Sequence, residues 1–246
     1  MKNFNNEEYI CLATDLIGDI FYTQSSYRGK ISTIRQYAEV IIRKILDVEP
    51  DKMVTLGHKE IQVKVKALSN YEFIYNAMEI IRGKGNLSTH TQYLESLTPE
   101  DFNNIVDALF DMLAFLLINY FEKYEFGSRG DVMSSFSLLP PIIRYKVLSY
   151  LHLKYPKNIS IIDKLVLAIM KAFNIEEASR WVEREKGILI HLDTMSEKAY
   201  NEAVEQAGVE FANIIKNSGP TSMYHLCIEK ISMVGTTINK NGLLYS

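Results

Sequence analysis

One stretch of the sequence decides the fold class: residues 98–123, which read TPEDFNNIVDALFDMLAFLLINYFEK. Thr98 is suited to cap a helix, and Pro99 suits the first helical position because proline lacks an N–H. Asp101 follows Thr98 by three residues and forms an acidic variant of the capping box. The stretch therefore predicts a long helix that begins at Thr98 and extends to about Lys123.

The apolar part of this helix, residues 105–121, raises the question of a membrane span. It is shorter than the roughly 20 residues that a bilayer requires, and it contains Asp107 and Asp111. These two carboxylates are spaced i, i+4 and share one helix face. The pattern favours a buried helix with one solvent-exposed edge. The polar start of the chain, residues 1–9, shows no secretory signal, and we expect a cytoplasmic protein with no membrane partner.

Helical periodicity continues through most of the chain. Helices are expected over residues 6–22, 25–46, 71–82, 141–153, 160–172, 175–186, 196–216 and 221–238. Residues 58–68 favour a short helix, although alternating apolar positions leave a strand open. Gly83 and Gly85 are expected to break or distort the helix that begins at residue 71, and residues 126–137 form a segment rich in Gly, Ser and Asp. The sequence predicts an all-α protein with an N-terminal domain, residues 1–126, and a C-terminal helical lobe, residues 138–246.

The composition is that of a globular chain without an obvious cofactor. Of 246 residues, 47% are hydrophobic and 23% are charged, and the formal net charge of −3 argues against a general polyanion binder. Cys11 and Cys227 cannot build a disulfide framework. No nucleotide-binding loop, HExxH or GxSxG motif occurs, and the five histidines do not follow metal-ligand spacing. We therefore expect neither a metal nor a cofactor.

One segment carries candidate chemistry: residues 79–92, EIIRGKGNLSTHTQ. Arg82 and His90 are eight residues apart, a little over two helical turns, so both can project to one side of a bent helix. A histidine can transfer protons to or from a ribose 2′-OH near neutral pH, and an arginine can hold a phosphate in a two-point fork. The pair is thus sufficient for RNA cleavage without metal.

The surroundings of this segment are basic. Residues 52–90 contain six Lys or Arg residues and three Glu residues. Such a local excess, which includes Lys64, Lys66 and Lys84, suits a groove that binds an RNA backbone. A structural interpretation stays open beside it, in which Gly85 and Asn86 form a turn, His90 caps a helix and Arg82 pairs with a carboxylate. Arg35 and Glu39, spaced i, i+4, are either a surface ion pair or residues that orient Arg82.

The order of these features resembles the HEPN superfamily (higher eukaryotes and prokaryotes nucleotide-binding), specifically its bacterial branch found in restriction and phage-defence proteins. The resemblance covers about residues 6–125. Its matching pieces are RQYAEVIIR at 35–43, Ile81-Arg82, Gly85-Asn86, His90 and the long apolar helix 101–123.

The resemblance implies a HEPN-like helical bundle and a metal-independent endoribonuclease of a bacterial anti-phage defence or toxin system. Arg82 and His90 would be catalytic in an R-x(4–6)-H type of motif, although seven residues separate them here. Asn86 would contact RNA together with Lys84, Lys64 and Lys66. The family usually joins two motifs in a homodimer, and a protein from a neighbouring gene is a further expected partner. Many members of this branch are non-nucleolytic, so a dimerising module that binds RNA or protein is the alternative.

Overall fold

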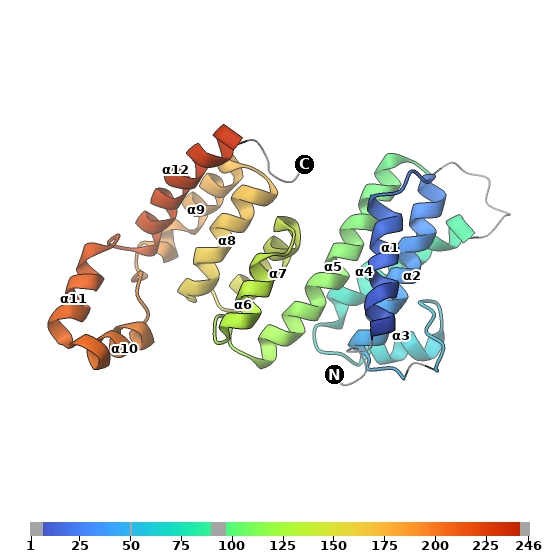
Figure 1. Ribbon diagram of the computed structural model, residues 1–246, viewed down its shortest axis with the longest axis horizontal. Helices are drawn as coiled ribbons and strands as arrows, with labels where there is room; N and C mark the ends of the chain where they lie inside the picture. The colour runs from blue at the N-terminus through green and yellow to red at the C-terminus, as the bar shows by residue number, and fades with distance from the viewer. Residues whose placement is uncertain (1–6, 50, 90–96, 242–246) are drawn as a thin grey trace. The chain divides into compact units, whose positions relative to one another are not determined.

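The structure is a computed structural model that describes residues 7–49, 51–89 and 97–241. Within these ranges it contains twelve α-helices and no strand, which confirms the all-α class (Figure 1). The chain divides into two compact units, residues 1–119 and 120–246. The division falls within the long helix predicted from Thr98, some residues before the turn-rich segment 126–137.

Unit 1 is a helical bundle whose members follow the predicted ranges closely. Its helices are α1 (Glu7–Phe21), α2 (Tyr27–Ile45), α3 (Lys59–Lys66), α4 (Tyr71–Thr89) and most of α5 (Pro99–Lys123). The open choice at residues 58–68 is decided in favour of a helix, α3. Helix α2 packs against α1 and α4, and α3 packs against α4 (Figure 1).

The core of unit 1 consists of apolar side chains that recur at helical spacing. They include Ile20 of α1, Ile34 and Ile42 of α2, Val65 of α3, Met78 and Ile81 of α4, and Leu109, Met112 and Phe115 of α5. Burial of such side chains is worth roughly 1.5–3 kcal/mol each. The packing of α2, α4 and α5 around this core fixes the polar face of α4 that carries the candidate chemistry.

The predicted start of α5 is confirmed in detail. The backbone N–H of Thr98 donates to Asp101 Oδ2 at 3.0 Å, and the N–H of Asp101 donates to Thr98 Oγ1 at 3.1 Å. These reciprocal bonds satisfy donors that have no partner inside the helix. Helix α5 also has the length and hydropathy to span a membrane, and 44% of its apolar 18-residue stretch is buried inside the protein. A buried core helix has both properties, so they do not by themselves assign a location.

The prediction that Gly83 and Gly85 interrupt a helix is wrong, because α4 continues through both to Thr89. Gly85 is buried where α4 approaches α2, and a Cβ added there would lie 2.8 Å from Cδ of Arg35. Nothing lies within 4 Å of the corresponding position at Gly83. Gly85 therefore serves close helix packing, and this tertiary role outweighs its low helix propensity.

Unit 2 is a second helical assembly, built from the end of α5 through α12. Its main helices are α7 (Pro141–Lys154), α8 (Ile159–Ala172), α9 (Ile175–Leu189) and α12 (Met223–Asn241). Helix α8 packs against α7, α9 and α12.

Two expectations for this part of the chain were incomplete. The turn-rich segment contains a short helix, α6 (Gly130–Ser137), because Phe136 is buried edge-on against Phe121 and Phe126. The single helix expected over 196–216 is two helices, α10 (Glu197–Ala207) and α11 (Val209–Ser218). Gly208 separates them with a φ of 87°, a conformation that ends a helix and favours glycine.

Candidate functional site

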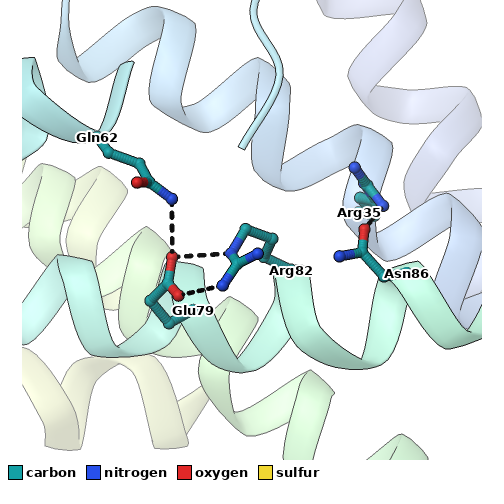
Figure 2. Close-up of polar contacts among 5 residues, drawn as sticks. All are labelled: Arg35, Gln62, Glu79, Arg82 and Asn86. Atoms are coloured by element: carbon teal, nitrogen blue, oxygen red, sulfur yellow. Dashed lines mark hydrogen bonds and ion pairs between the residues drawn. The ribbon is translucent and has the colours of Figure 1, made fainter. Parts of the chain in front are cut away.

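The candidate site lies on a half-buried polar face of α4, beside the side that enters the core. Ile74, Met78 and Ile81 are buried in unit 1, whereas Glu79, Arg82 and Asn86 recur at spacings of three and four residues on another face. Figure 2 shows Glu79 facing Gln62 of α3, Asn86 facing Arg35 of α2, and Arg82 facing Glu79 of its own helix. The helical period therefore separates a packing role from a polar role within one helix.

Arg82 is held by Glu79, one turn earlier in α4. Its Nε donates to Glu79 Oε1 at 2.9 Å, and its Nη2 donates to Oε2 at 2.6 Å (Figure 2). The amide of Gln62 on α3 donates to the same Oε1 at 3.3 Å. The hydrogen bonds that Arg82 donates to Glu79 raise the pKa of Arg82, so the guanidinium stays charged throughout the accessible pH range. The carboxylate thus fixes both the orientation and the charge of Arg82.

This arrangement leaves part of the Arg82 guanidinium available to bind an anion. A guanidinium has five N–H donors, and the two-point contact with Glu79 uses one on Nε and one on Nη2. Two of the other three lie along the Nη1–Nη2 edge, which matches the geometry of a phosphate, and the third, on Nη1, points toward the Cδ side. One third of the Arg82 side chain is exposed, 33%. A phosphate can therefore reach Arg82 without displacing Glu79, although Glu79 offsets part of the positive charge.

Arg35 and Asn86 connect α2 to α4 beside this pair. Arg35 Nη1 donates to Asn86 Oδ1 at 2.6 Å, and Arg35 Nε lies 3.6 Å from Glu39 Oε1 (Figure 2). Glu39 also accepts from the backbone N–H of Leu56 at 3.4 Å, while partial burial raises its pKa. The Arg35–Glu39 pair is half-buried, and its arginine bonds to Asn86. Arg82, in contrast, takes its orientation from Glu79.

The three lysines expected to contact RNA all have partners within the protein. Lys84 Nζ lies 2.6 Å from Asp101 Oδ1, and Lys64 Nζ lies 2.6 Å from Glu60 Oε1. Lys66 Nζ lies 4.4 Å from the centre of the Tyr75 ring. Lys84 and Lys64 remain more than 40% exposed, so a phosphate can exchange with their carboxylate partners at low energetic cost. The positive electrostatic field around α4 is nevertheless weaker than the excess of Lys and Arg over Glu in residues 52–90 indicates.

His90, the predicted proton-transfer residue, lies outside the described residues. The helix that leads to it ends at Thr89 and is anchored just before that end. Arg28 Nη1 of α2 donates to the carbonyl oxygens of Leu87 and Ser88 at 2.8 and 3.2 Å. Ser88 is itself buried and donates to the carbonyl oxygen of Gly85. The last turn of α4 is thus fixed against α2.

Three residues of this site were missed in the sequence: Glu79, Gln62 and Arg28. The partner of Arg82 had a local signal, because Glu79 precedes Arg82 by three residues on a helix face. Gln62 and Arg28 had none, because helix packing brings them to α4 from distant parts of the chain. The chain at Gly57, which precedes His58, also comes close to Arg82, since a Cβ added at Gly57 would lie 3.8 Å from Cδ of Arg82.

Groups of three or more His, Cys, Asp or Glu side chains close enough to hold a metal ion do not occur in the described part of the chain. The polar groups around Arg82 are instead arranged as donor–acceptor pairs. Their chemistry is that of anion recognition and hydrogen bonding.

Comparison with known proteins yields no match: no family model, no curated protein and no solved structure is similar to this chain. The function is accordingly inferred from the residues and their geometry.

Proposed function

We propose that this protein is a metal-independent endoribonuclease of a bacterial anti-phage defence or toxin system, with a HEPN-like bundle as its N-terminal unit. The observation that carries the proposal is the Arg82–Glu79 pair. It presents a charged, oriented and partly exposed guanidinium with three N–H donors left over by Glu79. An arginine held in this way is preorganised for a phosphate.

In the proposed reaction, Arg82 binds the scissile phosphate and stabilises the negative charge that grows in the transition state. His90 removes the proton from the ribose 2′-OH or donates one to the leaving 5′ oxygen. The 2′ oxygen forms a bond to phosphorus while the bond from phosphorus to the leaving oxygen breaks. The products are a 2′,3′-cyclic phosphate and a 5′-hydroxyl. All groups required for these steps belong to the protein and the RNA.

RNA is the proposed substrate, and Lys84, Lys64 and Lys66 with Asn86 are the proposed contacts to it. We propose a cytoplasmic homodimer, because one Arg and one His per chain supply half of the paired motif implied by the resemblance. Helix α5 contributes no exposed apolar face to this dimer, since its large apolar side chains from Ile105 to Phe121 are buried or half-buried. A further partner encoded by a neighbouring gene would regulate the activity.

The test uses the full chain, labelled single-stranded RNA and excess EDTA. Wild type should release fragments with 2′,3′-cyclic ends, and Arg82→Ala and His90→Ala should each lower the rate by about 10²–10⁴-fold. His58→Ala is the matched histidine control and should cleave normally. Loss of activity in His58→Ala with retention in His90→Ala would refute the assignment of His90. RNA left uncut by the dimer, with and without the neighbouring gene product, would refute nuclease activity.

A non-catalytic binding module is the second candidate, and one observation favours it. Arg82 and Asn86, both in the segment that resembles the HEPN superfamily, are engaged in contacts that hold α4 to itself and to α2. In this case Arg82→Ala should lower the melting temperature, whereas a catalytic Arg82 at the partly exposed edge should leave it nearly unchanged. Thermal unfolding of Arg82→Ala, measured beside RNA cleavage by the same variant, separates the two candidates.

A further inference from the structure

Unit 2 contains a cavity of about 510 Å³ at the side of α9, among residues of α7, α8 and α9. This volume lies in the range of small-molecule sites, roughly 300–1,000 Å³. Its apolar lining is provided by Tyr145, Ile169, Phe173 and Trp181, and its polar lining consists of Arg180 and Arg184 together with Asn174 and Glu177. The proposed cleavage chemistry uses none of these residues.

The aromatic side chains of the cavity are held in defined positions. The ring of Tyr145 packs edge-on against Phe173, with centres 4.8 Å apart and planes at 90°. Trp181 is buried and contacts the ring of His152 at 5.3 Å. Phe173, by contrast, is 41% exposed. A flat ring that enters the cavity can therefore stack on Phe173 without displacing a core residue.

The two arginines stand one helical turn apart on the same face of α9. Their side chains are 72% and 70% exposed for Arg180 and Arg184. Arg180 Nη1 donates to Glu177 Oε1 at 2.5 Å, and Arg184 Nε lies 3.7 Å from Glu185 Oε1. Each carboxylate faces only part of a five-donor guanidinium, and exposed pairs of this kind are weak. Both arginines can therefore bind an anion at the cavity.

We propose that this cavity binds a nucleotide, with the base stacked on Phe173 and the phosphate held by Arg180 and Arg184. An aromatic wall next to two guanidinium groups provides the two elements that nucleotides require, a flat apolar surface and a forked cation. Two sources share this chemistry: a free nucleotide and a nucleotide unit within single-stranded RNA. The proposal goes beyond the proposed cleavage at Arg82 and does not depend on it, because the two sites belong to different units.

Trp181 gives the proposal a direct readout, because it is the sole tryptophan in the sequence. We would follow its fluorescence while titrating the full chain with adenosine 5′-monophosphate. Adenosine and ribose 5-phosphate serve as the arms that lack phosphate or base. A short 2′-O-methyl oligonucleotide, which 2′-OH attack cannot cleave, represents the RNA strand. We expect a saturable change with the complete nucleotide and weaker binding of both fragments.

Variants assign the signal to the cavity. Arg184→Ala should weaken nucleotide binding about tenfold or more and lower its salt dependence. Phe173→Leu, which keeps an apolar side chain but removes the stacking face, should weaken it to a similar extent. Arg129→Ala is the control, because it removes an arginine of the same charge that is 58% exposed and does not line this cavity. It should bind as wild type.

The outcomes separate the sources and test the proposal. Tighter binding of the oligonucleotide than of the mononucleotide assigns the cavity to single-stranded RNA, and the reverse assigns it to a free nucleotide. An unchanged Trp181 signal with both ligands at millimolar concentration overturns the proposal. Equal affinity in Arg184→Ala and wild type, or equal affinity for ribose 5-phosphate and the nucleotide, overturns it as well.

Discussion

Arg82 and Glu79 form a two-point ion pair across one turn of α4, with donor–acceptor distances of 2.9 and 2.6 Å. Glu79 therefore has two opposing effects on a phosphate at this site. It fixes the guanidinium in one orientation, and it repels the phosphate through its negative charge. The two effects can be measured separately, because one acts on turnover and the other on affinity.

We expect Glu79→Gln to bind 2′-O-methyl RNA more tightly than wild type and to cleave RNA more slowly. Loss of the carboxylate should make the negative slope of log affinity against log salt steeper by about one unit. Loss of the two-point contact should lower the cleavage rate, by up to about 10²-fold if the guanidinium moves by an ångström. Filter binding at several salt concentrations and single-turnover cleavage measure these effects.

Glu72→Gln is the matched control for this variant, because Glu72 is an exposed residue in the first turn of the same helix. It removes the same charge at a distance from Arg82. Equal affinities and salt slopes for the Glu79 and Glu72 variants would show that Arg82 does not contact RNA.

Gly83 and Gly85 are expected to respond in opposite directions to replacement by alanine. Gly83→Ala should stabilise α4 by up to ~1 kcal/mol, because its new methyl group meets no atom within 4 Å. This corresponds to a rise in melting temperature of roughly 2–4 °C for a chain of this size. Gly85→Ala should destabilise the protein by about 1–3 kcal/mol, because its Cβ would lie 2.8 Å from Cδ and 3.3 Å from Cβ of Arg35.

A double-variant cycle tests the cause of the second effect. Arg35→Ala removes the crowded side chain, so Gly85→Ala should be tolerated better in that background than in wild type. Thermal unfolding of the four proteins gives the coupling. Equal melting temperatures for Gly83→Ala and Gly85→Ala would contradict the close approach of α2 and α4.

The two glycines also show which parts of this fold the sequence can predict. The start of α5 was predictable to the residue, because Thr98, Pro99 and Asp101 act within four positions of one another. The continuity of α4 was not, because Gly85 owes its place to Arg35, fifty residues earlier. The local signal therefore predicted the start of α5, whereas a glycine required by helix packing has the same local signal as a helix breaker.

The candidate site divides in the same way. Arg82 was found from its spacing to His90 and from the family resemblance, and its partner Glu79 was within reach of the i, i+3 rule. Arg35 and Asn86 were named separately, but nothing in their spacing indicated that they bond to each other at 2.6 Å. Their contact depends on how α2 packs against α4, which becomes known only from the fold.

The two cysteines should differ strongly in reactivity. Cys11 is exposed on α1, whereas Cys227 is buried and its burial raises the thiol pKa to about 12. At pH 8 the reactive thiolate of Cys227 is then only about one part in ten thousand. Titration of the native protein with Ellman's reagent should give one fast equivalent, and a second should appear after denaturation. Cys11→Ser should abolish the fast equivalent, and a fast reaction in that variant would contradict the packing of α12.

The contribution of Asp101 to stability should depend on pH in a predictable direction. Lys84 and the capping contacts with Thr98 lower the pKa of Asp101 to about 2, from an ordinary value of 3.8. A carboxyl whose pKa is lower in the folded state stabilises that state above its unfolded pKa, and this effect is lost as the pH falls through the folded value. Asp101→Asn should therefore lower the urea midpoint at pH 7, and its difference from wild type should shrink between pH 4 and pH 2.

Glu100→Gln provides the comparison for Asp101→Asn, because Glu100 stands in the same first turn of α5 but does not form the capping box. Both substitutions remove a charge that interacts favourably with the helix dipole. The larger loss at pH 7 should belong to Asp101→Asn, and added salt should reduce the part that comes from Lys84. A difference between wild type and Asp101→Asn that stays constant from pH 7 to pH 2 would show that the ion pair and the charged cap do not stabilise α5.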